Sequence, residues 1–160
     1  MKISIRTSRR IEDARNILVR GTNWIGDVIM TLPAMAAIRR AFPGARISVL
    51  AKPWVADIFS LCSDVDEVIL YRSPGVHAGV GGILRLAGEL REKKFDAAIL
   101  LQNAIEAAII SFLAGIPVRA GYNSDGRGPL LTHSVKRTRA VRRIHQVDYY
   151  LEMVKTLGCV

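Results

Sequence analysis

Asp27 is the residue of this sequence whose type and position are best suited to chemistry. It ends the segment RGTNWIGD (20–27), which follows the apolar run 17–19 and opens a helical pattern. In α/β enzymes, a strand, a glycine-containing turn and a helix together place a functional group at the edge of a sheet. The carboxylate would be a fixed negative charge directed at a ligand, although aspartate also favours the first turn of a helix for stability alone. Gly21 and Gly26 have the spacing of neither a dinucleotide fingerprint nor a P-loop.

Other polar side chains follow the other expected strands, and they comprise amides, carboxylates and cations. Loops that follow parallel strands gather at one edge of a sheet, so we expect these side chains to meet there. Such a set suits hydroxyl-rich, anionic molecules such as phosphorylated sugars. No His or Cys pair has the spacing of metal ligands, so neither a metal nor a cofactor is expected. The candidate binding residues are Asn23, Trp24, Lys52, Arg72, Gln102, Asn103, Asp125 and Arg127.

Trp24 has two interpretations. The first, which we favour, is that it packs against the helix that follows as a hydrophobic staple. The second is that it stacks on a sugar ring at the sheet edge.

Strands and helices alternate along the chain, which predicts an α/β fold: a Rossmann-like, three-layer domain with a mostly parallel sheet. A helix is expected to continue to about residue 157 and to stop at Gly158, and Pro33 is expected to kink the first helix. Residues 1–15 are polar and basic and are expected to be an extension ahead of a domain spanning 16–160. The expected strands are 17–20, 47–50, 68–71, 97–101 and 118–121, and the expected helices are 25–42, 54–61, 81–94, 104–113 and 147–157.

The charge of the chain is +9 over 160 residues, and part of it is concentrated in the segment 133–143, which has no acidic residue. Such a segment either attracts an anionic partner or is a solvated, mobile loop. Aromatic residues do not alternate with its cations, so a stacking surface for single-stranded nucleic acid is not indicated. Two distant cysteines fit a reducing compartment, and no apolar run approaches the ~18 residues of a membrane span. The cations of this basic segment are Lys136, Arg137, Arg139, Arg142 and Arg143.

Six short motifs occur in a characteristic order along the chain: NWIGD (23–27), LP (32–33), QN (102–103), R-x-GY (119–122), DGRG (125–128) and HQVDYY (145–150). Together they resemble the ADP-heptose:lipopolysaccharide heptosyltransferases of glycosyltransferase family 9, in particular the heptosyltransferase II type, and the resemblance covers about residues 16 to 160. Relatives often have Leu-Pro-Asn-Ser where this chain has LQNA at 101–104, so a role for the serine hydroxyl is not carried over, whereas Asn103 matches.

The resemblance implies that this chain is the amino-terminal, acceptor-binding half of a two-domain GT-B enzyme, inactive alone. The absent carboxyl-terminal half would hold ADP-heptose, and the whole enzyme would transfer heptose, with inversion, to a heptose of the lipopolysaccharide core. Asp27 matches the base of the family. The basic segment would bind the domain peripherally to the cytoplasmic face of the inner membrane, with no role for nucleic acid. Without the second half, the domain is expected to expose apolar surface and to self-associate.

An alternative from a different class remains open. In that reading the chain is a non-enzymatic α/β module that binds an anionic membrane surface or nucleic acid through residues 133–143. Both readings use cations, so the salt dependence of binding does not separate them.

Overall fold

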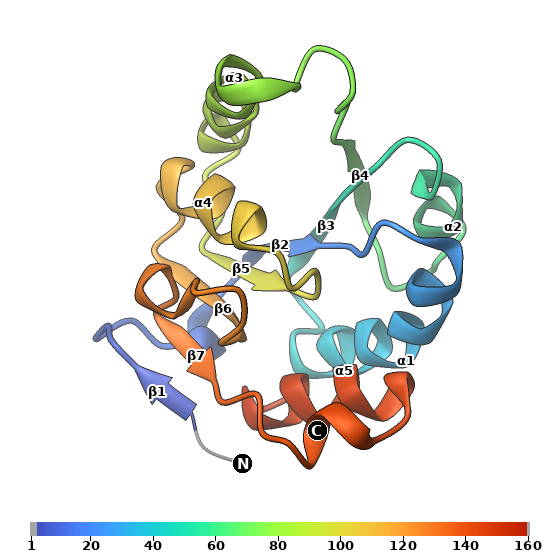
Figure 1. Ribbon diagram of the computed structural model, residues 1–160, viewed down its shortest axis with the longest axis vertical. Helices are drawn as coiled ribbons and strands as arrows, with labels where there is room; N and C mark the ends of the chain where they lie inside the picture. The colour runs from blue at the N-terminus through green and yellow to red at the C-terminus, as the bar shows by residue number, and fades with distance from the viewer. Residues whose placement is uncertain (1–2, 160) are drawn as a thin grey trace.

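A computed structural model describes residues 3–159 as one seven-stranded sheet with helices on both faces (Figure 1). The strand order is β1-β7-β6-β5-β2-β3-β4. Six strands run parallel, and only β1 pairs antiparallel, with β7. The strands are β1 (Ile3–Ile5), β2 (Asn16–Arg20), β3 (Arg46–Ala51), β4 (Glu67–Leu70), β5 (Ala97–Leu100), β6 (Val118–Tyr122) and β7 (His133–Val135).

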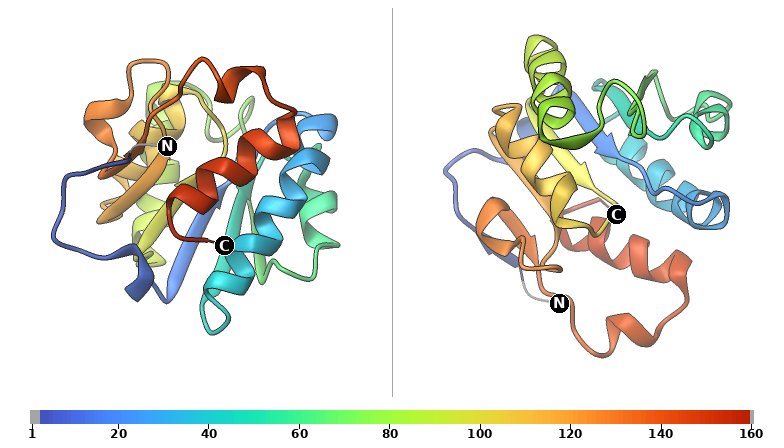
Figure 2. Two further views of the ribbon diagram at one scale, coloured as in Figure 1. Left: turned by 90° about the horizontal axis from the view of Figure 1, so that it is seen from below. Right: turned by 45° about the horizontal axis from the view of Figure 1, so that its top comes forward.

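Within residues 3–159, five α-helices form the outer layers. Helices α1 and α5 pack side by side on one face of the sheet, and α3 and α4 pack together on the other (Figure 2). None of the helices within residues 3–159 is long and apolar enough to cross a bilayer. The helices are α1 (Ile25–Ala41), α2 (Ala56–Ser60), α3 (Gly79–Glu92), α4 (Ile105–Leu113) and α5 (Gln146–Thr156), with short 3-10 turns η1 (Ile11–Asp13), η2 (Gly128–Leu130) and η3 (Val141–Arg143).

The central strands are apolar on both faces, because each face is covered by helices. Ile17 and Val19 of β2 belong to the core under α1 and α5, whereas Leu18 between them belongs to the core under α3 and α4. Successive residues of a strand point to opposite faces, so a buried parallel strand requires a continuous apolar run. The expected three-layer, mostly parallel α/β fold is confirmed.

The amino-terminal segment is more than an extension. Within residues 3–15, β1 pairs with β7, with Ile3 opposite Val135, and η1 buries Ile11 in the core. Residues 1 and 2 lie outside the described part of the chain. The sequence did not indicate β1 or β7, because each is three residues long and β7 carries His133 and Ser134, which do not form an apolar run.

The carboxyl-terminal ends of β2 to β6 lie along one edge of the sheet, and the loop after β2 is held there by close packing. The Gly21 amide donates to the Leu50 carbonyl at 3.0 Å, which extends the pairing with β3 beyond the strand. A Cβ atom at Gly21 would lie 2.8 Å from the Phe59 ring, so only glycine lets the loop approach α2 this closely.

Candidate functional site

Asp27 lies in the first turn of α1, as expected, with its side chain half-buried. It does not cap the helix: the residue at the N-cap is Trp24, whose carbonyl accepts from the Val28 amide at 2.9 Å. The Asp27 carboxylate has no hydrogen bond or ion pair with any residue between 3 and 159. Its charge contributes, after burial, to the raised pKa of Tyr150 on α5. Asp27 is therefore an unengaged carboxylate at the junction of α1 with α5.

Asn23, four residues before Asp27, is held at two points. Its side-chain Oδ1 accepts from Arg20 Nη2 at 2.9 Å, and its backbone carbonyl accepts from the indole Nε1 of Trp54 at 2.7 Å. These contacts join the loop after β2 to the loop after β3.

Arg20, at the last position of β2, belongs to a cluster of charged and aromatic groups. Lys52 Nζ lies 4.2 Å from the centroid of the Tyr71 ring, and Arg20 Cζ lies 5.3 Å from the same centroid. The Tyr71 hydroxyl donates to the carboxylate of Glu106 at the start of α4. Two cations, Arg20 and Lys52, face one carboxylate, Glu106, so this cluster carries an excess of one positive charge.

Burial sets the ionisation of the same cluster. It lowers the pKa of Arg20 to about 10, so the guanidinium is still charged at neutral pH. Burial, followed by the hydrogen bond to Glu106, raises the pKa of Tyr71 to about 12, so the phenol keeps its proton. The pKa of Lys52 is lowered by partial burial and then by the nearby charge of Arg20.

Trp24 does not form the predicted staple, because 70% of its surface is exposed. A staple joins the residue before the N-cap to the fourth residue of the helix. Those positions are held by Asn23, which is polar, and Val28, so no apolar pair exists there. Trp54 is also exposed, at 51%, and its indole is fixed by the bond to Asn23. Sequence reasoning did not select Trp54.

Arg127 is fully buried, and most of its guanidinium binds backbone. Its Nε donates to the Tyr122 carbonyl at 2.9 Å, and its Nη1 donates to the carbonyls of Gln102 at 2.6 Å and Ala104 at 3.3 Å. Arg127 therefore clamps the loop after β6 to the loop after β5. Its role as a ligand contact stays a prediction, and Nη2 is the guanidinium nitrogen without a partner among residues 3–159.

Asn103 lies beside this clamp. Its Nδ2 donates to the Tyr149 hydroxyl at 2.9 Å, and its backbone carbonyl accepts from Ser124 Oγ at the same distance. Gln102 is half-buried, and Asp125 is exposed in a left-handed turn with φ of 51°.

Three buried polar atoms in these loops have no hydrogen-bond partner among residues 3–159: Thr22 Oγ1, Asn103 Oδ1 and Arg127 Nη2. Buried polar atoms in proteins are nearly always paired with protein groups or with ordered water. Their presence at this sheet edge indicates places where water or a ligand supplies the missing partner.

Arg72 lies at the outer side of this edge, after β4, and is exposed. Its backbone amide donates to Nδ1 of the buried His77 at 2.9 Å, while Nε2 of that ring lies 3.0 Å from Glu89. Among residues 3–159, Arg72 has no hydrogen bond, ion pair or cation–π contact with the loop at 21–24, so the structure does not bring it together with Asp27.

The basic segment is partly ordered secondary structure: residues 133–135 form β7 and residues 141–143 form η3. Its side chains Lys136, Arg139, Arg142 and Arg143 are exposed. Arg137 is half-buried, with its Cζ 5.7 Å from the Tyr149 ring, so it is the least available of the five to a partner.

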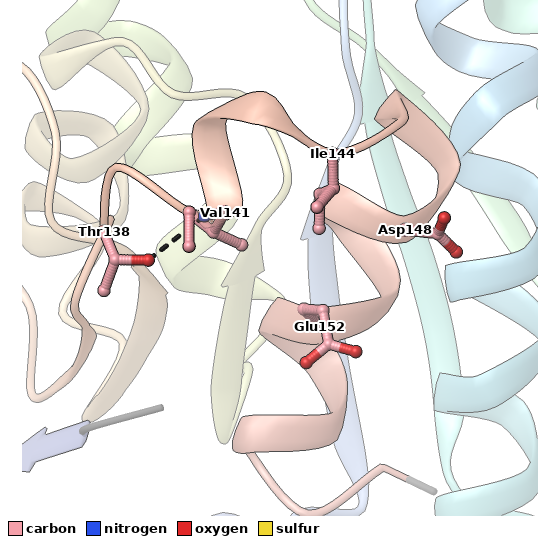
Figure 3. A pocket seen from close by; sticks show the side chains of 6 residues that line it. Thr138, Val141, Ile144, Asp148 and Glu152 are labelled. Carbon is pink, nitrogen blue, oxygen red and sulfur yellow. Dashed lines mark hydrogen bonds between the residues drawn. The ribbon is translucent and has the colours of Figure 1, made fainter.

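A hollow lies between the basic segment and α5 (Figure 3). The charged groups that line it are the carboxylates of Asp148 and Glu152, next to Val141 and Ile144. An anion is therefore not favoured in the hollow, and any anionic surface would meet the exposed cations instead.

Comparisons with known proteins support a single family. Residues 83–157 match the family described as Glycosyltransferase family 9 (heptosyltransferase). Lipopolysaccharide heptosyltransferase 2 of Escherichia coli strain K12 is 34% identical over 115 residues, which cover 72% of this chain and 33% of that protein. The corresponding protein of Salmonella typhimurium is 35% identical with the same coverage. The chain thus spans about a third of the length of these curated relatives.

Solved structures agree with the fold. The glycosyl transferase family 9 structure from Veillonella parvula superposes with a TM-score of 0.82 at 23% identity, covering 91% of this chain and 42% of that one. The E. coli ADP-heptose lps heptosyltransferase II gives a TM-score of 0.75 at 26% identity, covering 91% and 43%. On these matches, the chain belongs to glycosyltransferase family 9 and is similar to heptosyltransferase II.

Proposed function

We propose that this chain is the acceptor-binding half of a lipopolysaccharide heptosyltransferase, in which Asp27 is the base that activates the attacking sugar hydroxyl. The observation that carries the proposal is the Asp27 carboxylate, which has no partner among residues 3–159 and lies where α1 meets the sheet edge. The donor, ADP-heptose, would be held by the other half of the enzyme.

Asp27 would act when the cleft is closed. A positioned base typically contributes ~10²–10⁴-fold to such a reaction. The carboxylate lies in the first turn of α1, beside the partial positive charge of the helix amino terminus. Binding of acceptor and donor would exclude water from the site and hold the sugar hydroxyl against the base. The isolated chain is therefore expected to bind acceptor without transferring heptose.

The acceptor would lie along the loops after β2, β3 and β5. The indole faces of Trp24 and Trp54 are exposed there, the amides of Asn23, Gln102 and Asn103 can bind hydroxyls, and the excess positive charge near Lys52 suits an anionic sugar. Asp125 and Arg72 would contribute from the ends of this edge.

Saturation-transfer NMR with a heptosylated inner-core oligosaccharide tests the proposal, using the wild type and Asp27→Asn. Binding by both proteins is expected, because Asp27 acts in the chemical step. An RNA oligonucleotide in parallel samples tests the alternative class of function. Binding of RNA alone would contradict the proposal in favour of a nucleic-acid module. Mixing the chain with ADP-heptose and acceptor should give no product by mass spectrometry.

The exposed cations of the basic segment would hold the domain peripherally at the cytoplasmic face of the inner membrane. A basic residue near an anionic bilayer contributes about 1 kcal/mol. Sedimentation with anionic vesicles should show binding that weakens with salt and is lost when all five cations, 136, 137, 139, 142 and 143, are neutralised. Vesicle binding that survives this change would contradict the role of the basic segment in membrane binding.

Self-association is the remaining proposal about partners. Four exposed apolar side chains, Trp24, Ile25, Ile29 and Trp54, lie at or near the start of α1. Exposed apolar patches in soluble proteins commonly mark interfaces. Sedimentation equilibrium is expected to show oligomers at high concentration, and a strict monomer would contradict the proposal.

A further inference from the structure

The contact between Arg20 and Asn23 determines whether the oxygen or the nitrogen of the Asn23 side-chain amide faces Arg20, and therefore which of the two faces away from it. A guanidinium has only donors, so the amide atom 2.9 Å from Arg20 Nη2 must be the oxygen. The Nδ2 group, with two N–H donors, is directed elsewhere and has no partner among residues 3–159. The orientation of the amide thus follows from chemistry and not from an arbitrary assignment of its oxygen and nitrogen.

The backbone of Asn23 is fixed as well. Its carbonyl accepts from Trp54 Nε1 at 2.7 Å, so the residue cannot turn as a whole to present its oxygen outward. Asn23 directly precedes Trp24 at the N-cap of α1, and Asp27 lies one turn further along. A free amide donor is therefore held in the loop that leads into α1, four residues before the proposed base.

Arg20 is itself held by its surroundings. Its Nη1 donates to the carbonyl of Gly21, and only 3% of the residue is exposed. A buried cation requires compensation, which Glu106 supplies through its charge while it accepts from Tyr71. Arginine makes the two contacts from two different nitrogens, Nη1 to Gly21 and Nη2 to Asn23, whose directions are fixed by its planar fork. The donors of lysine diverge from one nitrogen on a flexible side chain and do not reproduce this geometry.

We infer that Arg20 is a positioning residue: it orients the Asn23 amide so that its NH₂ group donates to an oxygen of the ligand bound beside Asp27. The inference rests on the proposed function in one respect, namely that this ligand is the acceptor sugar. Arg20 does not contact the ligand in this arrangement. Glu106 acts indirectly, because its carboxylate balances the charge of Arg20.

The test uses the ¹⁵N-labelled 160-residue chain. The variant Arg20→Lys keeps the charge and removes the fork, and Arg119→Lys is the matched control. Arg119 is a half-buried arginine that also donates to backbone carbonyls, those of Leu130 and Ile116, but lies near the other end of β6. Two quantities are measured: the order parameter of the Asn23 side-chain NH₂ group, and the Kd for a heptosylated inner-core oligosaccharide.

In the wild type, the order parameter should be near the ~0.85 of rigid backbone, and in Arg20→Lys it should fall below about 0.6. The Kd should rise about three- to tenfold in Arg20→Lys, as expected for one impaired neutral hydrogen bond. Arg119→Lys should change neither quantity. An unchanged Asn23 order parameter in Arg20→Lys would overturn the inference, since a general loss of stability does not act on this one group.

A second variant keeps the test decisive if Arg20→Lys does not fold. Asn23→Asp preserves the oxygen that faces Arg20 and removes the NH₂ donor. It should melt no lower than the wild type and raise the Kd about fivefold or more; an unchanged Kd would overturn the inference. If the wild type fails to bind the oligosaccharide, the proposed function fails, and the order parameter alone still decides whether Arg20 orients Asn23.

Discussion

Replacing Arg127 by lysine should destabilise the domain strongly. The guanidinium donates to three carbonyls, those of Tyr122, Gln102 and Ala104, from a fully buried position. A hydrogen bond to a charged group contributes about 1.5–3 kcal/mol, and a lysine ammonium can reach only part of this set. Loss of two bonds, partly offset by water, should lower the free energy of unfolding by about 3–5 kcal/mol.

For a domain of this size, that loss corresponds to a decrease in Tm of about 10 °C. Differential scanning calorimetry measures it, with urea unfolding to check that the m-value is unchanged. The control Arg142→Lys, at an exposed position, should leave Tm within about 1 °C. A Tm change below about 2 °C in Arg127→Lys, together with weakened binding of the oligosaccharide, would refute the structural role and restore Arg127 as a ligand contact.

Two further predictions concern stability. Burial lowers the pKa of His133, so the unfolded chain binds a proton first as pH falls through about 6.5, and stability should decrease from pH 7 to pH 5. Thermal unfolding across this range should show a smaller decrease in His133→Gln than in the wild type. In α3, a Cβ at Gly82 would lie 2.0 Å from the backbone carbon of His77, so Gly82→Ala should lower Tm markedly. Gly81→Ala, which meets no atom within 4 Å, should instead stabilise by about 0.5–1 kcal/mol, and equal effects of the two changes would contradict the packing.

The parts of the fold that could be predicted are those where burial on both faces demands a continuous apolar strand. The run at 17–19 lies within β2, and the run at 97–101 contains β5, within a residue or two of the observed bounds. Gly158 ends the last helix as expected, with a φ of 101° that suits glycine. The two short strands β1 and β7 gave no such pattern, because β7 buries the polar residues His133 and Ser134 and β1 is largely exposed at an edge of the sheet.

The positions of the candidate residues at the sheet edge could be predicted from the sequence, but most of their contacts could not. The rule that loops after parallel strands meet at one edge correctly placed Asn23, Asp27 and Asn103 after β2 and β5 at that edge, and their role in binding stays a prediction. It could not show that Arg127, between two glycines in an apparently exposed turn, is buried. It also missed the partnership of Arg20 with Glu106, because the two residues are 86 positions apart and are brought together only by the pairing of β2 with β5.

The spatial distribution of the charged side chains could not be predicted from the sequence either. The basic segment reads as one cluster in the sequence, yet Arg137 is turned toward Tyr149 and the adjoining hollow is lined by Asp148 and Glu152. Only the other four cations are exposed. The excess positive charge near Tyr71 comes from Arg20 and Lys52, which are 32 positions apart in the sequence. No run of basic residues in the sequence indicates that these two side chains lie together.

The most direct test of the central claim uses the two tryptophans, which give two indole N–H signals in a ¹H–¹⁵N spectrum. Both indoles are exposed, Trp24 at the N-cap of α1 and Trp54 in the loop after β3, and the Trp54 N–H is bonded to Asn23. Titration with a heptosylated inner-core oligosaccharide should shift both indole signals and the amides of residues 23–27. Shifts confined to residues 133–143, or no shift at any concentration, would contradict the assignment of this edge as the acceptor site.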